Sequence, residues 1–266
     1  MEPHGRIFPL QPSRDQDGEV TVYVKGFLAR GEEPDHFESW RDSHGALEVS
    51  HGWGSAAFGY HWPSGNFWSR PVAVMGTAKA TWDLIRIARS ARRAARLSYW
   101  GAMLAEETAL VASRFVHQYW SAARQAAERA EDHAAHLREL ARRYRRVRVV
   151  AHSLGCRHVI EAVTQIGVSE RPHEIHLCAA ACREADVADK LAALARERTY
   201  LYFTEKDRLL ELAFTPLARG RALGVTGPQR NYNGLTAIDV GEHFDFWVHS
   251  EYKNRFGRLV PATAAG

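Results

Sequence analysis

The sequence predicts an α/β protein in which helices cover both faces of a mostly parallel sheet. From residue 147 onward, strand candidates alternate with helical segments, which is the pattern of consecutive βαβ units. In 147–160, a run of β-branched residues is followed by a tight corner and then by apolar residues at helical spacing. Before it, the stretch from about 77 to 146 is rich in Ala, Arg, Glu and Leu and has no proline, which predicts a long helical insert.

The composition is typical of a globular protein. Of the 266 residues, 45% are hydrophobic and 25% are charged, and we expect one domain over 19–260 after a mobile lead-in over 1–18. No apolar run reaches the ~18 residues that a membrane span needs, and the first residues do not resemble a signal peptide. We therefore expect a cytoplasmic protein.

The cysteines and the net charge limit the possible ligands. Cys156, Cys178 and Cys182 are too few and too irregularly spaced for a disulfide framework, so we expect buried thiols, no metal and no cofactor. The formal charge of +4 is mild and no nucleic-acid-binding motif is present, so we expect no nucleic-acid partner. The oligomeric state is left open.

The remaining elements are expected on both sides of the insert. Residues 30–51 are polar and predict a loop, which Trp40 would anchor in the core. The expected strands are 20–24, 56–62, 174–178, 199–204 and 235–240, and the last expected helix is about 246–256.

Charged residues of the insert are expected at its surface. Four arginines at intervals of three and four residues share one helical face, which we interpret as solvated, with an anionic membrane surface as the alternative contact. The segment 101–115 has few charges and could cap a site. His133 and His136 are expected to be solvated, and the arginines from 142 to 148 suit a helix carboxyl end. The four arginines are Arg86, Arg89, Arg93 and Arg96.

Ser153 occupies the corner between the strand and the helix of 147–160. Ala151 and Gly155 flank it, and small residues at these positions let the strand and helix backbones pass closely. A serine hydroxyl is a weak nucleophile, so it needs an imidazole base and a carboxylate that orients the base. The segment resembles the nucleophile elbow of the α/β-hydrolases, with Ala151 in place of the usual first glycine.

That resemblance implies an acid after a later strand and a histidine near the end of the chain. Asp207 follows the expected strand 199–204 and is preferred over Glu205 as the acid. For the base we prefer His249, because His-Ser-x-Tyr is similar to the histidine loop of lipase-like members, and His243 is the alternative.

The resemblance also implies an oxyanion hole and a substrate site. The backbone N–H groups of Leu154 and Phe27 would bind the oxyanion, with Lys25 standing where related enzymes often have histidine. Gly26, His152 and Trp62 are the expected substrate-contacting residues.

The implied function is that of a serine esterase or lipase. Aromatic residues near the first two loops, Phe27, Trp62, Phe67 and Trp68, favour an apolar acyl group, so we expect a small or lipid-like ester as substrate. The alternative is a hydrolase-fold protein without activity that serves as a binding or scaffolding module through its helical insert. A weaker similarity is to a lipase-like branch that includes the hydrolase domains of transmembrane and coiled-coil proteins.

Overall fold

The fold is described from a computed structural model of the chain. It describes residues 5–11, 18–27, 37–62, 64, 122–245 and 248–262. The predictions for the insert before residue 122 lie outside this range, including the possible cap over 101–115. So do two of the aromatic residues expected near the site and the four arginines expected to share a face: Phe67, Trp68, Arg86, Arg89, Arg93 and Arg96.

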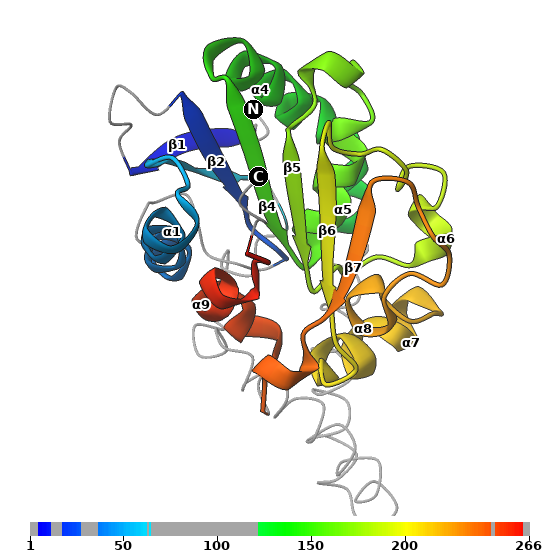
Figure 1. Ribbon diagram of the computed structural model, residues 1–266. Coiled ribbons are helices and arrows are strands. Elements are labelled where there is room, and N and C mark those ends of the chain that lie inside the picture. The colour runs from blue at the N-terminus through cyan, green and yellow to red at the C-terminus, as the bar shows by residue number, and fades with distance from the viewer. Residues whose placement is uncertain are drawn as a thin grey trace, which may run out of the picture.

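A seven-stranded sheet forms the centre of the described part, with the spatial order β1-β3-β2-β4-β5-β6-β7. Strand β1 is antiparallel to β3, and the other neighbouring pairs are parallel. The mostly parallel α/β architecture predicted from the alternation of elements is therefore observed (Figure 1). The strands are β1 (Arg6–Gln11), β2 (Glu19–Val24), β3 (Ala56–His61), β4 (Arg146–His152), β5 (Glu174–Cys178), β6 (Arg198–Phe203) and β7 (Leu235–Asp239).

The prediction of a mobile lead-in over 1–18 is wrong for β1, which begins at Arg6. Ile7 lies opposite Tyr60 of β3, and Leu10 is buried in the core. Pro9 cannot donate to a ladder, but β1 is an edge strand with only one neighbour, and the register shifts just after it. The prolines that suggested a loop are thus compatible with an edge strand.

Two pairs of helices cover opposite faces of the sheet. Helix α1 (Glu38–His51) packs against α9 (Val248–Leu259), and α4 (Ala130–Arg143) packs against α5 (Leu154–Val163). Tyr23 of β2 contacts Trp40 of α1, whereas Tyr60, in register with the next β2 residue Val24, stacks on His133 of α4. Because successive side chains of a strand point to opposite faces, the two pairs lie on opposite sides (Figure 1).

Helix α1 corrects the expected loop over 30–51. Trp40 is buried, as predicted, but it is carried by a helix that ends at Gly52 in left-handed conformation. The shorter elements are η2 (Val168–Glu170), α6 (Glu184–Val187), η3 (Leu210–Phe214), α7 (Thr215–Ala218), α8 (Leu223–Thr226) and η4 (Gly241–His243).

The prediction that His133 is solvated is also wrong. Its ring is fully buried and stacks on Tyr60 with the ring centroids 4.0 Å apart, and it also lies against His158 of α5 at 5.2 Å. Trp62 continues the stack on the other side of His158 at 4.7 Å. Polar helix composition suggested a solvated position, but this face of α4 meets rings from β3 and α5.

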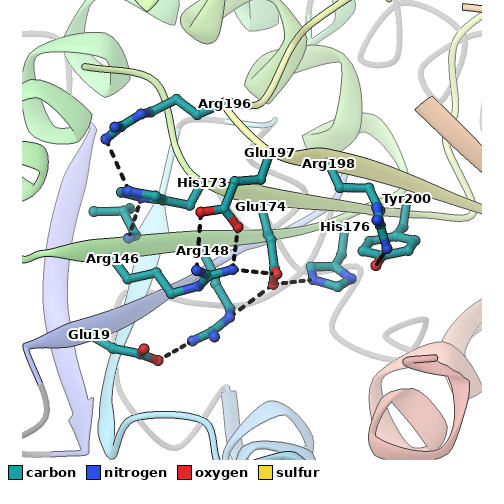
Figure 2. Close-up of polar contacts among 11 residues, drawn as sticks. Glu19, Arg146, Arg148, His173, Glu174, His176, Arg196, Glu197, Arg198 and Tyr200 are labelled. Carbon is teal, nitrogen blue, oxygen red and sulfur yellow. Dashed lines mark hydrogen bonds and ion pairs between the residues drawn. The ribbon is translucent and has the colours of Figure 1, made fainter. Parts of the chain in front are cut away.

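The arginines at the start of β4 belong to a charge network with carboxylates of β2 and β5 (Figure 2). Arg148 binds Glu19 of β2 at 2.6 Å and Glu174 of β5 at 2.9 Å, and its guanidinium lies over the ring of Trp53. Arg146 also binds Glu174, at 2.7 Å. Burial acts to raise the pKa of Glu174, but the imidazole of His176, 3.8 Å away, and the charge of Arg148 outweigh it and hold that pKa well below its ordinary value.

No helix in the described ranges is long and apolar enough to cross a membrane.

Candidate active site

Ser153 lies at a strained corner between β4 and α5. Its backbone has φ 56° and ψ −126°, a conformation that L-residues rarely adopt. Its N–H donates to the carbonyl of Cys178 in the next strand, and its own carbonyl accepts from Cys156 and Ala181. The strained conformation is therefore held by backbone bonds on both sides, with the side chain at the carboxyl edge of the sheet.

Glycine is required next to this corner because the loop after β2 approaches closely. A Cβ on Gly155 would lie 2.4 Å from the carbonyl oxygen of Lys25. A Cβ on Gly26 would lie 2.8 Å from the Cβ of Ser153 and 3.0 Å from the carbonyl oxygen of His152. Both approaches are too short for any side chain, so these two glycines bring the 25–27 loop against the serine.

Asp207 follows β6 and is fully buried. One carboxylate oxygen accepts a hydrogen bond from the N–H of Leu210, and the other accepts from Nδ1 of His249 at 2.8 Å. The Leu210 bond fixes the rotamer of the carboxylate, because the start of the following helix holds one of its two oxygens. The second oxygen is then directed at the imidazole.

His249 lies in the first turn of α9 and completes a chain of hydrogen bonds. Its Nδ1–H donates to Asp207, which leaves Nε2 as an acceptor for the hydroxyl of Ser153 at 3.0 Å. The serine and the histidine are 96 residues apart in sequence, and the histidine and the aspartate are 42 apart. The structure thus brings together the three residues that the sequence singled out for nucleophile, acid and base.

The two alternatives lie elsewhere. Glu205 has a largely exposed side chain that forms an ion pair with Arg221 at 3.3 Å. His243 is 40% exposed and lies beside Glu242 at 3.5 Å. No contact joins either of them to Ser153, so the geometry favours Asp207 and His249.

His152 positions the candidate base, His249, through a hydrogen bond to its backbone. Its Nε2–H donates to the backbone carbonyl of His249 at 2.7 Å, and the two rings lie 4.7 Å apart. Burial lowers the pKa of His152 well below its usual value, and the nearby imidazole of His249 and ammonium of Lys253 lower it further. His152 therefore stays neutral and positions His249. The sequence predicts that His152 contacts substrate, but its buried ring is better suited to this positioning role.

Trp62 supports the 25–27 loop and stacks on His158. Its indole N–H donates to the carbonyl of Lys25 at 2.9 Å, and the hydroxyl of Ser64 donates to the carbonyl of Gly26 at 3.2 Å. The sequence predicts that Trp62 contacts substrate, but its side chain is fully buried. Its role in the structure is to bind the backbone of the 25–27 loop.

The two expected oxyanion donors flank the serine. Leu154 is the first residue of α5, so its N–H has no acceptor within the helix. Phe27 is half-buried and follows Gly26, whose backbone abuts Ser153. Leu154 thus directly follows the serine, and Phe27 directly follows the glycine whose backbone packs against it.

Lys206 is a supporting residue that sequence reasoning missed. Its ammonium donates to the carbonyls of Gly241 at 2.7 Å and Phe244 at 2.8 Å, which ties the acid turn to the segment that leads into α9. Both acceptors are backbone oxygens distant in sequence, so no residue pattern could have indicated them.

The three cysteines are free and buried, as the sequence predicted. The thiol of Cys156 donates to the carbonyl of Cys178 at 3.4 Å. In the part of the chain that the structure describes, no group of three or more His, Cys, Asp or Glu side chains has a geometry that could hold a metal ion.

Comparison with protein-family models and with curated protein sequences finds no match for this chain. Among solved structures, the chain is similar to the apo form of Thermogutta terrifontis esterase 2, with 10% sequence identity and a TM-score of 0.37. The alignment covers 97% of this chain and 91% of that one. A likeness this weak establishes neither fold family nor activity, so the functional case depends on the geometry of the site.

Proposed function

We propose that this chain is a serine hydrolase of the α/β-hydrolase fold that cleaves a carboxylic ester through an acyl-enzyme on Ser153. The observation that carries the proposal is the hydrogen-bonded series from Ser153 through His249 to Asp207, with distances of 3.0 and 2.8 Å. These are the contacts that nucleophilic catalysis by a serine requires. The strained corner at Ser153 and the order of serine, acid and histidine along the chain support the same assignment.

In the first half of the reaction, the Ser153 hydroxyl attacks the ester carbonyl while Nε2 of His249 takes its proton. The carboxylate of Asp207 stays ionised, keeps the proton of the imidazole on Nδ1 and stabilises the imidazolium that forms. The imidazolium then gives its proton to the leaving oxygen, the carbon–oxygen bond breaks and the alcohol departs. The acyl group remains on the serine.

The negative oxygen of the tetrahedral intermediate needs preorganised donors. In this proposal the N–H groups of Leu154 and Phe27 supply them, and loss of one such donor typically costs ~100- to 1,000-fold in rate. Water then attacks the acyl-enzyme, with His249 as base, and releases the acid. Phe27 follows the glycine that packs against Ser153, and an apolar, half-buried side chain at this point of the loop supports an apolar acyl group, which is why we propose a small or lipid-like ester.

A fluorophosphonate probe tests the proposal, because it labels only an activated serine. The wild type should be labelled, and Ser153→Ala should abolish the label. Ser169→Ala, at an exposed serine of η2, is the matched control and should keep it. A folded wild type that neither reacts with the probe nor hydrolyses para-nitrophenyl butyrate would contradict the proposal and favour a protein that only binds.

A further inference from the structure

Lys206 directly precedes the candidate acid, Asp207, and its side chain reaches a distant turn of the chain. The ammonium donates to the backbone carbonyls of Gly241 at 2.7 Å and Phe244 at 2.8 Å, which lie 35 and 38 residues later. These oxygens belong to the turn over 241–244, the bridging turn, which contains η4 and precedes α9. Because the donor is charged, both contacts are of the stronger, charge-assisted kind.

The acid turn and the bridging turn also meet at the end of the sheet. The N–H of Val240 donates to the carbonyl of Phe203 at 2.9 Å. A Cβ on Gly241 would lie 3.0 Å from Oγ1 of Thr204, and the same oxygen accepts a hydrogen bond from the N–H of Lys206 at 3.2 Å. The backbone of Lys206 is therefore fixed beside the turn that its ammonium binds.

The bridging turn packs on α9, the helix that carries the candidate base. The ring of Phe244 lies 4.8 Å from that of Tyr252, which follows the base by three residues on this helix. Arg255 of α9 donates to the carbonyl of His243, and its guanidinium lies over the ring of Phe244. The bridging turn is thus bound by two cations, Lys206 from the acid turn and Arg255 from the helix of the base.

Arg208, which directly follows Asp207, makes a local contact instead. Its side chain is 63% exposed and pairs with Glu211, three residues later. Within the described residues it has no contact with the bridging turn. Removal of either cation takes a positive charge from a neighbour of Asp207, but only the loss of Lys206 breaks the bonds to the bridging turn. The two residues therefore separate an effect of charge from an effect of position.

We propose that Lys206 is a positioning residue, which aligns the imidazole of His249 with Asp207 through the bridging turn. This inference rests on the proposed serine hydrolase function. The bond of 2.8 Å between Nδ1 of His249 and Asp207 joins two separate elements, so it depends on how the acid turn and α9 are held together. Without the ammonium, α9 is held less firmly against the acid turn, and the imidazole spends less time in the geometry that the reaction needs. Small misplacements of a catalytic group lower the rate of the chemical step more than they lower substrate binding.

Steady-state kinetics test the inference. Lys206→Met removes the ammonium from an exposed side chain, and it should lower kcat for para-nitrophenyl butyrate by about 10- to 100-fold with KM nearly unchanged. Arg208→Met is the matched control, since it removes the neighbouring positive charge, and it should keep kcat within about 2-fold of the wild type. Circular dichroism of both variants checks that they are folded.

Proton NMR reports on the alignment without turnover. The Nδ1 proton of His249, held by the carboxylate of Asp207, should give a resonance far downfield of the amide protons, and His249→Gln identifies this resonance by its loss. In Lys206→Met the resonance should move upfield or broaden, because the bond to Asp207 is made for only part of the time. In Arg208→Met it should stay as in the wild type.

Three results would overturn the inference while the hydrolase proposal stands. They are a folded Lys206→Met variant with the kcat of the wild type, equal losses of kcat in Lys206→Met and Arg208→Met, and an unchanged downfield resonance in Lys206→Met. If the wild type hydrolyses no ester, the hydrolase proposal fails, and the resonance alone decides whether Lys206 positions His249 against Asp207.

Discussion

Lowering the pH should reduce the free energy of unfolding of this protein, because several histidines are buried in their neutral form. The size of this effect can be worked out for His158. Burial lowers the pKa of its ring from 6.5 to about 4. The unfolded chain therefore takes up a proton as the pH falls through 6.5, whereas the folded chain does so only near 4. The stabilisation is complete above pH 6.5 and is lost between 6.5 and 4. At about 1.36 kcal/mol for each pH unit, the loss is about 3 kcal/mol.

The substitution His158→Phe isolates this contribution. Phenylalanine keeps a flat ring on Trp62, but it loses the Nδ1–H donor to the carbonyl of Ala126 at 2.8 Å. We expect the variant to be less stable than wild type by about 1–3 kcal/mol near neutral pH, because a buried carbonyl is left without its donor. At about pH 4.5 the difference in unfolding free energy between wild type and variant should shift by about 2–3 kcal/mol in favour of the variant. Only the wild type loses the stabilisation that neutral His158 provides.

Urea unfolding followed by circular dichroism at several pH values measures the difference. Buried histidines away from His158, such as His44, contribute to both proteins and cancel in the comparison, whereas the stacked ring of His133 shares in the effect of the substitution. Ser169→Ala, which changes an exposed residue of η2 that does not titrate, is the control, and its stability curve should stay parallel to that of the wild type. Parallel curves for wild type and His158→Phe would refute the reasoning.

Three substitutions at the site have distinct expected outcomes. Asp207→Asn should lower kcat for ester hydrolysis by about 10,000-fold, because the amide cannot hold the imidazole in the required tautomer; a folded variant with near-normal rates would argue against the assigned acid. Gly26→Ala should abolish fluorophosphonate labelling, because the new Cβ would lie 2.8 Å from that of Ser153, and unchanged labelling would contradict the requirement for glycine at this position. Trp62→Phe keeps the ring but not the N–H bond to Lys25, and we expect kcat to fall by about 10-fold with KM nearly unchanged, because one donor to a buried carbonyl is worth about 1 kcal/mol.

The sequence predicted well the parts of this fold that depend on neighbouring residues. The β4–α5 unit requires a β-branched run, a small-residue corner and a helical pattern, all within 147–160, and the structure follows that order. The three later strands were also placed within a residue or two of their observed ends. In each case the local pattern and the tertiary environment favour the same element.

The predictions that failed depend on partners far away in sequence. Edge strand β1 exists because β3, some 50 residues later, offers it a ladder. The ring of His133 is buried because Tyr60 and His158 supply flat apolar surfaces, although the residues around it on α4 are polar. Periodicity and composition depend only on residues close in sequence. They therefore cannot predict the pairing of β1 with β3 or the packing of His133 against Tyr60 and His158.

The candidate site lies at the carboxyl ends of the strands, and the charge network lies at their amino ends. The network stabilises the strand register on which the site depends. The candidate catalytic groups follow β4, β6 and β7, and the loop of Gly26 follows β2, so their spacing depends on the register of parallel strands. At the opposite edge, Arg148 of β4 binds Glu19 of β2 and Glu174 of β5 (Figure 2). Since a slip of one residue in any of these strands would leave a buried charge unpaired, the network fixes the register on which the site at the carboxyl edge depends.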